Sequence, residues 1–252
     1  MSNRVLIVTG GSRGIGAATS ELAAQRGYAV LVNYVGNSAA AEALCAKIHN
    51  AGGTALSIQA DVSQEADIDR IFEAADRMGR LAGLVNNAGV VDVAARVEDF
   101  DFDRLTRMFS INTLGTILCS GRAVRRLSTR HGGQGGSIVN VTSAAAKLGS
   151  PGTYVDYAAS KGAIDTFTVG MALEVAAEGI RVNGVCPGII DTDIHASGGD
   201  PGRAARMARD LPMGRTGTAL EVAQAIVWLM SDEASYTTGS VINVAGGRGI
   251  FP

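Results

Sequence analysis

Tyr157 and Lys161 are separated by one helical turn in this 252-residue chain, a spacing that can support proton transfer. Residues at positions i and i+4 of a helix share one face, so we expect the two side chains to be neighbours. A nearby ammonium group stabilises a phenolate and lowers the pKa of a tyrosine from about 10. Such a tyrosine can exchange a proton with a carbonyl or alcohol oxygen. Because a lone Tyr-x-x-x-Lys pair is more often a solvated surface pair, its meaning depends on the rest of the chain.

A glycine-rich turn near the start of the chain is the second pattern with chemical meaning: Gly10-Gly11-Ser12-Arg13-Gly14-Ile15-Gly16. It follows an apolar, β-branched run (5–8) and precedes a helical stretch (17–26) that ends at Gly27. Glycines allow a sharp turn and close approach of a ligand, and a helix N-terminus favours phosphate. This strand, turn and helix therefore predict a site for the pyrophosphate of a dinucleotide.

The same turn also fits Gly-x-Ser-x-Gly, the nucleophile elbow of α/β-hydrolases, with Ser12 as the nucleophile. That class needs an acid and then a histidine later in the chain. The three histidines, His49, His131 and His195, do not lie in convincing settings. The turn also comes at the first strand, which is too early for the elbow, so the hydrolase interpretation is disfavoured.

Composition restricts the class of protein. Hydrophobic residues make up 46% of the chain and charged residues 18%, which is typical of a globular domain. The net charge of −2 provides no basic field for nucleic acid. No apolar run is long enough to cross a bilayer, which predicts no membrane partner. Met1-Ser2-Asn3-Arg4 leads directly into the first strand, which predicts no signal peptide. Cys45, Cys119 and Cys186 follow no metal-binding pattern, so we expect reduced thiols, no metal site and a cytoplasmic protein.

Strands and helices alternate from the start of the chain to its end. The expected strands are 5–8, 28–34, 54–60, 81–85, 137–142, 180–186 and 240–244. The expected helices are 17–26, 38–50 (capped by Ser38), 64–78, 102–126 with a bend near Gly115, 154–177, a short piece at 203–209, and 219–230. This pattern predicts an α/β fold: a doubly wound, parallel, seven-stranded Rossmann sheet with helices on both faces. We expect a single domain over residues 1–252, with a substrate lid at about 190–213.

Ligands of such a sheet bind at the carboxyl ends of its strands. Polar residues and glycines follow the expected strands at this edge. They are Gly10 to Gly16, Asn33, Tyr34, Asp61, Asn86 to Gly89, Ser143, Pro187 and Gly188.

These motifs, with Asn86-Asn87-Ala88-Gly89, Asn112, Ser143 and Tyr157-x-x-x-Lys161, follow one another at the intervals typical of one family. The chain resembles the short-chain dehydrogenase/reductase family over nearly its whole length. It is most similar to the group of 3-oxoacyl-carrier-protein reductases and glucose 1-dehydrogenases. The resemblance implies an oxidoreductase that transfers a hydride between a nicotinamide cofactor and a small carbonyl or alcohol substrate. A member that has lost catalysis and only binds nucleotide is the alternative.

The resemblance also implies roles for individual residues. Tyr157 would be the general acid/base, and Lys161 would lower its pKa and hold the nicotinamide ribose. Ser143 would hydrogen-bond the substrate oxygen, and Asn112 would hold a relay water through a local break in its helix. The remaining implied cofactor contacts are Asn87, Ala88 and Gly89 on the adenosine side, Asp61 and Val62 at the adenine, Pro187 and Gly188 after the sixth strand, and Ile190 and Thr192 at the carboxamide.

One interval departs from the family pattern, because Ser143 and Tyr157 are one residue further apart than usual. The extra residue lies in the loop 149–154, which contains Pro151 and two glycines and can absorb it. The resemblance further implies a homotetramer built through the 154–177 helix, the helix before it and the segment 239–251.

The end of the second strand bears on the choice of cofactor. An NAD enzyme of this fold places an acid there, whereas this chain has Val32-Asn33-Tyr34-Val35. Arg13 in the glycine-rich turn suits a 2′-phosphate, and Ser12 and Asn33 could add hydrogen bonds. We therefore expect NADP(H) to be preferred, with NAD(H) possible, and an acid at Asn33 to shift the preference toward NADH.

The substrate cannot be identified from the sequence. The segment 194–211 contains apolar, small and basic residues without a selective signature. Arg203, Arg206 and Arg209 could attract an anionic substrate, but arginines on a short helix more often form a solvated face.

Overall fold

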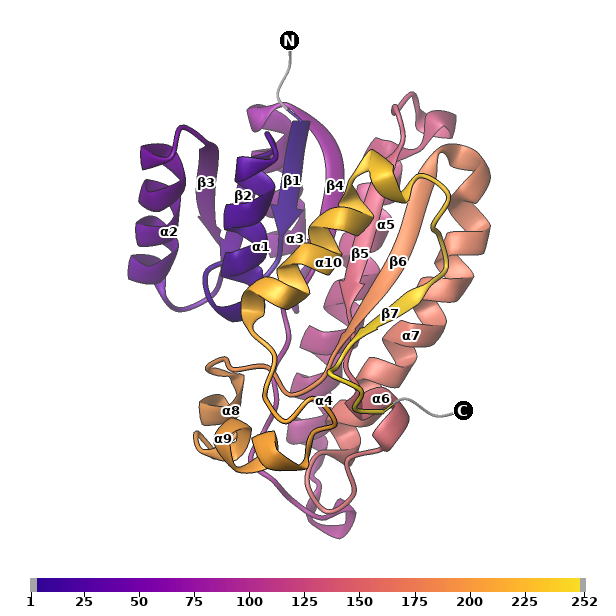
Figure 1. Ribbon diagram of the computed structural model, residues 1–252. Coiled ribbons are helices and arrows are strands. Elements are labelled where there is room, and N and C mark those ends of the chain that lie inside the picture. Colours follow the sequence, from indigo (N-terminus) through magenta and orange to yellow (C-terminus); the bar gives the residue numbers. More distant parts are fainter. Residues whose placement is uncertain (1–3, 250–252) are drawn as a thin grey trace.

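Seven parallel strands form the central sheet of the computed structural model, which describes residues 4–249 (Figure 1). Their order across the sheet is β3-β2-β1-β4-β5-β6-β7. The strands are β1 (Arg4–Val8), β2 (Ala29–Tyr34), β3 (Thr54–Gln59), β4 (Arg80–Asn86), β5 (Gly136–Val141), β6 (Ile180–Pro187) and β7 (Val241–Val244). The predicted doubly wound Rossmann sheet is therefore confirmed. Residues 1–3 and 250–252 lie outside the described residues. They include Met1 to Asn3, before the first strand, and the end of the predicted contact segment 239–251.

The order of the strands reverses beside β1. The chain runs from β1 outward through β2 to β3 and then returns to begin β4 on the other side of β1. In an open parallel sheet the ligand crevice lies at this reversal, beyond the carboxyl ends of the two strands. The fold thus brings the residues after Val8 and the residues after Asn86 to one place.

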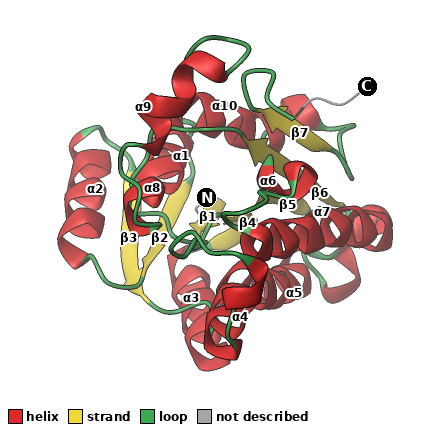
Figure 2. Cartoon of the chain, turned by 90° about the horizontal axis from the view of Figure 1, so that it is seen from below, coloured by secondary structure: helices red, strands yellow, loops and turns green. Residues whose placement is uncertain are grey.

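Both faces of the sheet are buried, because successive residues of a strand point to opposite faces. Leu6 and Val8 belong to one hydrophobic cluster, and Val5 and Ile7 belong to the other. Helices cover the two faces in two groups (Figure 2). The first group is α1 (Gly14–Gln25), α2 (Ser38–Asn50) and α10 (Ala219–Met230), and the second is α3 (Glu65–Met78), α5 (Thr116–Leu127) and α7 (Val155–Val175).

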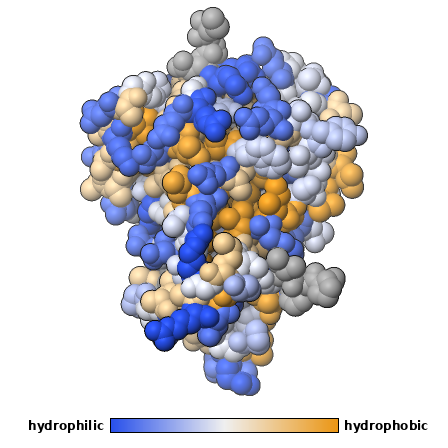
Figure 3. Space-filling model, in the orientation of Figure 1, coloured by the Kyte–Doolittle hydropathy of each residue, from blue (hydrophilic) through white to orange (hydrophobic). Residues whose placement is uncertain are grey.

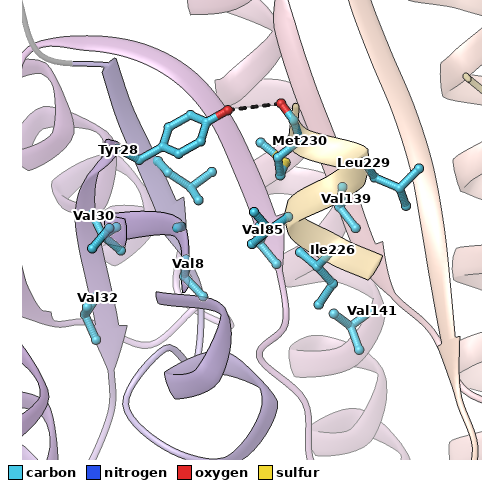
Figure 4. Close-up of a cluster of buried hydrophobic side chains, with 14 of the residues drawn as sticks. Val8, Tyr28, Val30, Val32, Val85, Val139, Val141, Ile226, Leu229 and Met230 are labelled. Carbon is cyan, nitrogen blue, oxygen red and sulfur yellow. Dashed lines mark hydrogen bonds between the residues drawn. The ribbon is translucent and has the colours of Figure 1, made fainter. Parts of the chain in front are cut away.

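The first cluster joins distant parts of the chain (Figure 4). Valines of four neighbouring strands pack toward Ile226 and Leu229 of α10. The Tyr28 hydroxyl, just before β2, donates a hydrogen bond of 3.0 Å to the Met230 carbonyl at the end of α10. The last helix is thus fixed to the first half of the sheet.

The predicted helix 102–126 consists of three segments. They are α4 (Phe102–Phe109), a π-helical turn η2 (Ser110–Gly115), and α5. An ideal Cβ at Gly115 would lie 2.7 Å from the Val62 carbonyl oxygen, so glycine permits this close approach to the loop after β3. The predicted bend near Gly115 is therefore confirmed, and it places Asn112 within the π-helical turn.

Other boundaries differ modestly from the prediction. Asn37, and not Ser38, caps α2, because its side chain accepts a hydrogen bond from the Ala40 N–H. The predicted piece 203–209 divides into α9 (Arg203–Met207) and η5 (Ala208–Asp210). Two one-turn helices, α6 (Ala145–Leu148) and α8 (Ile194–Ser197), were not predicted, because a single turn carries no periodicity. The remaining short helices are η1 (Val97–Asp99), η3 (Thr129–His131), η4 (Ala176–Glu178) and η6 (Asp232–Ala234).

The fold also bears on membrane spans, metal sites and cysteines. Within 4–249, no helix has the length and apolar character needed to span a bilayer. No group of three or more side chains suited to metal binding occurs in the same range. Cys45, Cys119 and Cys186 are all buried free thiols.

Candidate active site

Side chains fasten the glycine-rich turn after β1 to the end of β4. Thr9 Oγ1 accepts hydrogen bonds from the backbone N–H groups of Asn87 and Ala88, each at 3.0 Å. Asn87 Nδ2 donates in turn to the carbonyls of Thr9 and Gly10, each at 2.9 Å. The side chains of Thr9 and Asn87 therefore join the two strands at the reversal into one edge.

Gly16 lies where the turn folds back against its own beginning. An ideal Cβ there would lie 2.2 Å from the Gly10 carbonyl oxygen and 2.6 Å from Asn87 Nδ2, so a side chain would force the turn off β4. Helix α1 begins at Gly14, and its first N–H groups have no partner within the helix. The turn thus combines a close backbone approach with the positive end of a helix, as a pyrophosphate site requires.

Asn33 is a buried residue of β2, with only 1% of its surface exposed. Its Oδ1 accepts a hydrogen bond from the Gly10 N–H at 3.2 Å, and its Nδ2 donates to the Ala60 carbonyl at 2.7 Å. The side chain therefore ties the turn to the end of β3, and both of its polar atoms are engaged within the protein. The next residue, Tyr34, is only partly buried and lines the cavity, so an acid at position 34 is better placed to meet a bound cofactor than an acid at position 33.

Tyr157, Ser143 and Lys161 meet beyond the carboxyl end of β5. The Ser143 hydroxyl lies near enough to the Tyr157 phenol to lower its pKa. It also accepts a hydrogen bond from the Ala145 N–H at 3.1 Å. The buried Lys161 ammonium donates to the Val141 carbonyl at 2.8 Å and lies 5.9 Å from the centroid of the Tyr157 ring. Two hydroxyl groups and one ammonium group are thus gathered at one end of the sheet.

Burial controls the proton affinities of this group. Burial raises the pKa of the Tyr157 phenol, and the hydrogen bond with Ser143 opposes that change. Burial also lowers the pKa of the Lys161 ammonium to about 8, which the negative charge of Asp165 partly offsets. The net change in the Tyr157 pKa is therefore opposite to the expected lowering, because the loss of solvation of the phenol is the largest effect.

Asn112 is fully buried and points at the loop after β4. Its Oδ1 accepts from the Val90 N–H at 2.8 Å, and its Nδ2 donates to the Val90 carbonyl at 3.0 Å and to Ser160 Oγ at 3.1 Å. The side chain therefore fixes the π-helical turn to α7 and to Val90. An ideal Cβ at Gly89 would lie 3.4 Å from both Asn112 Oδ1 and Lys161 Nζ, so these two side chains approach Gly89 together.

A cavity of about 600 Å³ opens along this edge of the sheet. Its size lies within the usual range of cofactor sites. Most residues predicted for the site line it: Gly10, Ser12, Arg13, Gly14, Ile15, Asn33, Tyr34, Asp61, Val62, Asn87, Ala88, Gly89, Ser143, Tyr157, Lys161, Pro187, Gly188, Ile190 and Thr192. Gly16 and Asn112 lie behind the lining.

Further residues line the cavity. Tyr154 and Ser150 come from the loop 149–154, and Arg203 comes from the expected lid, where the sequence left open an anionic substrate or a solvated face. Val91 and, from the C-terminal segment, Arg248 were not predicted. No motif marks these positions, because the fold brings them together from separate loops.

The hydrolase interpretation finds no geometric support. Ser12 lines the cavity, but neither His49 nor His131 does. His49 Nε2 lies 2.8 Å from the Ala55 carbonyl oxygen beside β3, and His131 belongs to the 3-10 helix η3. Of the histidines whose side chains are described, none can therefore serve Ser12 as a base.

Comparisons with known proteins agree with this geometry. A family model described as enoyl-(acyl carrier protein) reductase matches residues 10–248. The uncharacterized oxidoreductase YgfF of Escherichia coli (strain K12) is 56% identical over 245 residues, which are 97% of this chain and 99% of the relative. A 3-oxoacyl-(acyl-carrier-protein) reductase of Synechocystis sp. is 36% identical over 257 residues, covering 100% of this chain and 99% of the relative.

Solved structures extend the likeness to three dimensions. A short-chain dehydrogenase/reductase from Serratia marcescens superposes with a TM-score of 0.90 at 32% identity, covering 99% of both chains. The likeness thus covers the glycine-rich turn and the Ser143, Tyr157 and Lys161 group in a single fold. This chain belongs to the short-chain dehydrogenase/reductase family of oxidoreductases, which use nicotinamide cofactors.

Proposed function

We propose that this protein is an NADP(H)-dependent oxidoreductase that transfers a hydride between the nicotinamide and a carbonyl or alcohol substrate, with Tyr157 as general acid/base. The observation that carries the proposal is the convergence of the Tyr157 and Ser143 hydroxyls beside the Lys161 ammonium, within the cavity that begins at the glycine-rich turn. Proton donors held at one point are the requirement for protonating a carbonyl oxygen during reduction.

The residues present fit a dinucleotide. The glycine-rich turn, whose close packing leaves no room for a Cβ at Gly16, suits the pyrophosphate together with the start of α1. Asp61 and Val62 line the cavity near the end of β3 and would hold the adenine. Ile190 and Thr192 would face the carboxamide, and Lys161 would also hold the nicotinamide ribose hydroxyls. When bound, the nicotinamide supplies or accepts the hydride.

The protein's own groups then manage the substrate oxygen and its proton. Ser143 and Tyr157 would donate hydrogen bonds to the carbonyl oxygen and orient its carbon. Because burial raises the pKa of Tyr157, the phenol is protonated at neutral pH and can donate its proton as negative charge develops on that oxygen. The Lys161 ammonium, fixed on Val141, would stabilise the phenolate that remains.

A preference for NADP(H) over NAD(H) is supported by the residues around the 2′ position. No acid stands at Asn33 or Tyr34, so nothing there repels a 2′-phosphate. Arg13 is exposed and lines the cavity next to Ser12. A guanidinium group matches the geometry of phosphate and keeps its charge.

A catalytically silent, nucleotide-binding member of the family is the second candidate. Such a protein would not need Ser143, Tyr157 and Lys161 together, nor an Asn112 fixed behind them by hydrogen bonds to Val90. The complete group therefore favours an enzyme.

We also propose a homotetramer and a substrate lid at about 190–213. Large hydrophobic side chains are exposed on the surface of α4 and α7, including Phe102 at 82% and Leu173 at 78%. At the same side of the sheet, β7 is an edge strand next to β6, and its Val241, Ile242 and Val244 are only partly buried. Figure 3 shows hydrophobic atoms grouped over this part of the face. Both surfaces support contact with further copies of the chain.

The activity can be tested by following NADPH absorbance with a panel of acyl thioesters, sugars and small ketones. We expect consumption of NADPH with at least one carbonyl compound and a higher kcat/KM than with NADH. Tight NADPH binding without turnover of any panel member would favour the silent alternative.

A further inference from the structure

Two arginines from distant parts of the chain, Arg203 and Arg248, line the same cavity. Arg203 is the first residue of α9, and Arg248 follows β7 in the C-terminal segment. The Arg248 guanidinium contacts α9 directly, since its Nη1 lies 3.8 Å from Met207 Sδ. The lid segment and the C-terminal segment therefore bring two cations to one wall.

Within residues 4–249, no carboxylate forms a salt bridge with either of these two cations. Neither guanidinium forms an ion pair there, whereas Arg206 on the same helix pairs with Asp200 and Arg215 pairs with Glu221. Burial lowers the pKa of Arg248, and the charge of Arg203 lowers it further. An anion between the two arginines would relieve both effects.

Tyr154 locates this wall relative to the reaction. The Arg203 guanidinium lies 4.9 Å from the centroid of the Tyr154 ring, which is buried at the N-cap of α7. Tyr157 follows three residues later on the same helix, so the two positions are separated by roughly one turn, about 5 Å. The arginines therefore lie at the substrate end of the cavity, whereas Arg13 stands at the glycine-rich turn.

We infer that Arg203 and Arg248 form a subsite for an anionic group of the substrate. The inference rests on the proposed function and names its substrate class: ketones, or the corresponding secondary alcohols, that carry a carboxylate, sulfonate or phosphate a few bonds from the reacting carbon. Guanidinium groups recognise such anions through paired, charge-assisted hydrogen bonds. A neutral ester of the same shape lacks the charge and is the matched poor substrate.

The test compares levulinate with methyl levulinate in steady-state reduction by NADPH. We expect wild-type kcat/KM to be at least about tenfold higher for the acid, the effect of one charge-assisted contact. Arg203→Gln and Arg248→Gln should each reduce kcat/KM for the acid by about tenfold or more and leave the ester nearly unchanged. Arg206→Gln is the control, because Arg206 pairs with Asp200 and does not line the cavity, and it should keep the wild-type ratio.

Calorimetric binding separates this inference from the proposed function, because the ketone cannot be reduced in the presence of NADP⁺. With the NADP⁺-saturated enzyme, wild type and Arg206→Gln should bind levulinate more tightly than its ester, and the two cavity variants should lose this difference. An oxoalkylsulfonate of the same length should show the same pattern. Equal binding of acid and ester by wild type, or an equal loss in Arg206→Gln, would overturn the subsite even if neutral ketones are reduced. Discrimination in binding without any turnover would instead count against the proposed function alone.

Discussion

The Lys161 ammonium donates a hydrogen bond of 2.8 Å to the Val141 carbonyl, which fixes the side chain to the last residue of β5. The lysine is therefore buried and directed at the sheet, with the Tyr157 ring beside it. Because both side chains are buried, the pKa of Tyr157 is raised and the phenol keeps its proton at neutral pH. The pKa of Lys161 is lowered to about 8, so its ammonium begins to lose its proton slightly above neutral pH.

The rate of carbonyl reduction should fall above pH 8. Below this value both Tyr157 and Lys161 carry their protons, since burial raises the pKa of the phenol and lowers that of the ammonium to about 8. Loss of the Lys161 charge at higher pH removes the group that stabilises the phenolate. A pH profile of kcat for reduction should therefore show a falling limb near 8.

The matched variant for this profile is Lys161→Arg. Arginine stays charged through this range, so the limb should move to higher pH, at a lower absolute rate because the guanidinium does not reproduce the hydrogen bond with Val141. An unchanged limb in the variant would assign it to another group.

Lys161→Met should abolish activity and yet stabilise the fold at neutral pH. The pKa of Lys161 in the folded protein lies below its ordinary value of 10.5, so the folded protein binds fewer protons than the unfolded chain between about pH 8 and 10.5. Stability thus rises with pH through that window, and below pH 8 the full penalty of burying the charge is present. That penalty is on the order of 3 kcal/mol. Lys161→Met removes the penalty but also loses the hydrogen bond with Val141, which offsets about 1 kcal/mol of the gain in stability.

Urea unfolding at pH 7 measures this difference. We expect Lys161→Met to gain about 1–2 kcal/mol over wild type and the gain to shrink as the pH approaches 10. Lys47→Met, which removes an exposed lysine paired with Glu21, should change stability by less than about 0.5 kcal/mol. A variant at Lys161 that is less stable than wild type at pH 7 would contradict the burial penalty.

The NADP(H) preference makes a prediction for Arg13 and Tyr34. Arg13→Ala should weaken NADPH binding by about ten- to a hundredfold, the value of a charge-assisted phosphate contact, and should change NADH binding far less. Tyr34→Asp should shift the kcat/KM ratio toward NADH, because a carboxylate there repels the 2′-phosphate and accepts from a 2′-hydroxyl. Equal losses for the two cofactors in Arg13→Ala would refute the assignment.

The buried ion pair between Arg104 and Asp156 should be a major contributor to stability. Arg104 Nε lies 2.7 Å from Asp156 Oδ2, and their side chains are 11% and 0% exposed. Asp156→Ala would leave the arginine charge unpaired and should cost about 3–5 kcal/mol in unfolding free energy. Asp69→Ala breaks an exposed pair with Arg122 and should cost less than about 1 kcal/mol. Similar losses of unfolding free energy in the two variants would show that other groups or water stabilise the Arg104 charge when Asp156 is removed.

Local patterns were enough to predict the sheet, whereas the grouping of Ser143, Tyr157 and Lys161 was predicted from the family resemblance. The buried strands are continuously apolar because both faces of a parallel sheet are covered, and the spacing of Tyr157 and Lys161 survives in any regular helix. The chain order of the strands also determined which loops share an edge.

Features that depend on packing could not be predicted in the same way. The direction of the Asn33 side chain follows from the positions of Gly10 and Ala60, and the raised pKa of Tyr157 follows from burial by several elements. Arg248 reaches the cavity only because β7 places the C-terminal segment beside α9. None of these relationships leaves a periodic signal in the sequence.

The most direct test of the account is the turnover of Tyr157→Phe, with NADPH binding measured on the same preparation. Removing the hydroxyl removes the proton donor and leaves the cradle for the cofactor unchanged, so kcat should fall by far more than tenfold while the NADPH Kd stays within about twofold. Tyr28→Phe is the control, because it removes a hydroxyl that bonds the Met230 carbonyl outside the cavity and should keep wild-type turnover. Retention of more than about a tenth of wild-type kcat by Tyr157→Phe, a loss of only ~1.4 kcal/mol in the barrier, would contradict the assignment of Tyr157 as the acid.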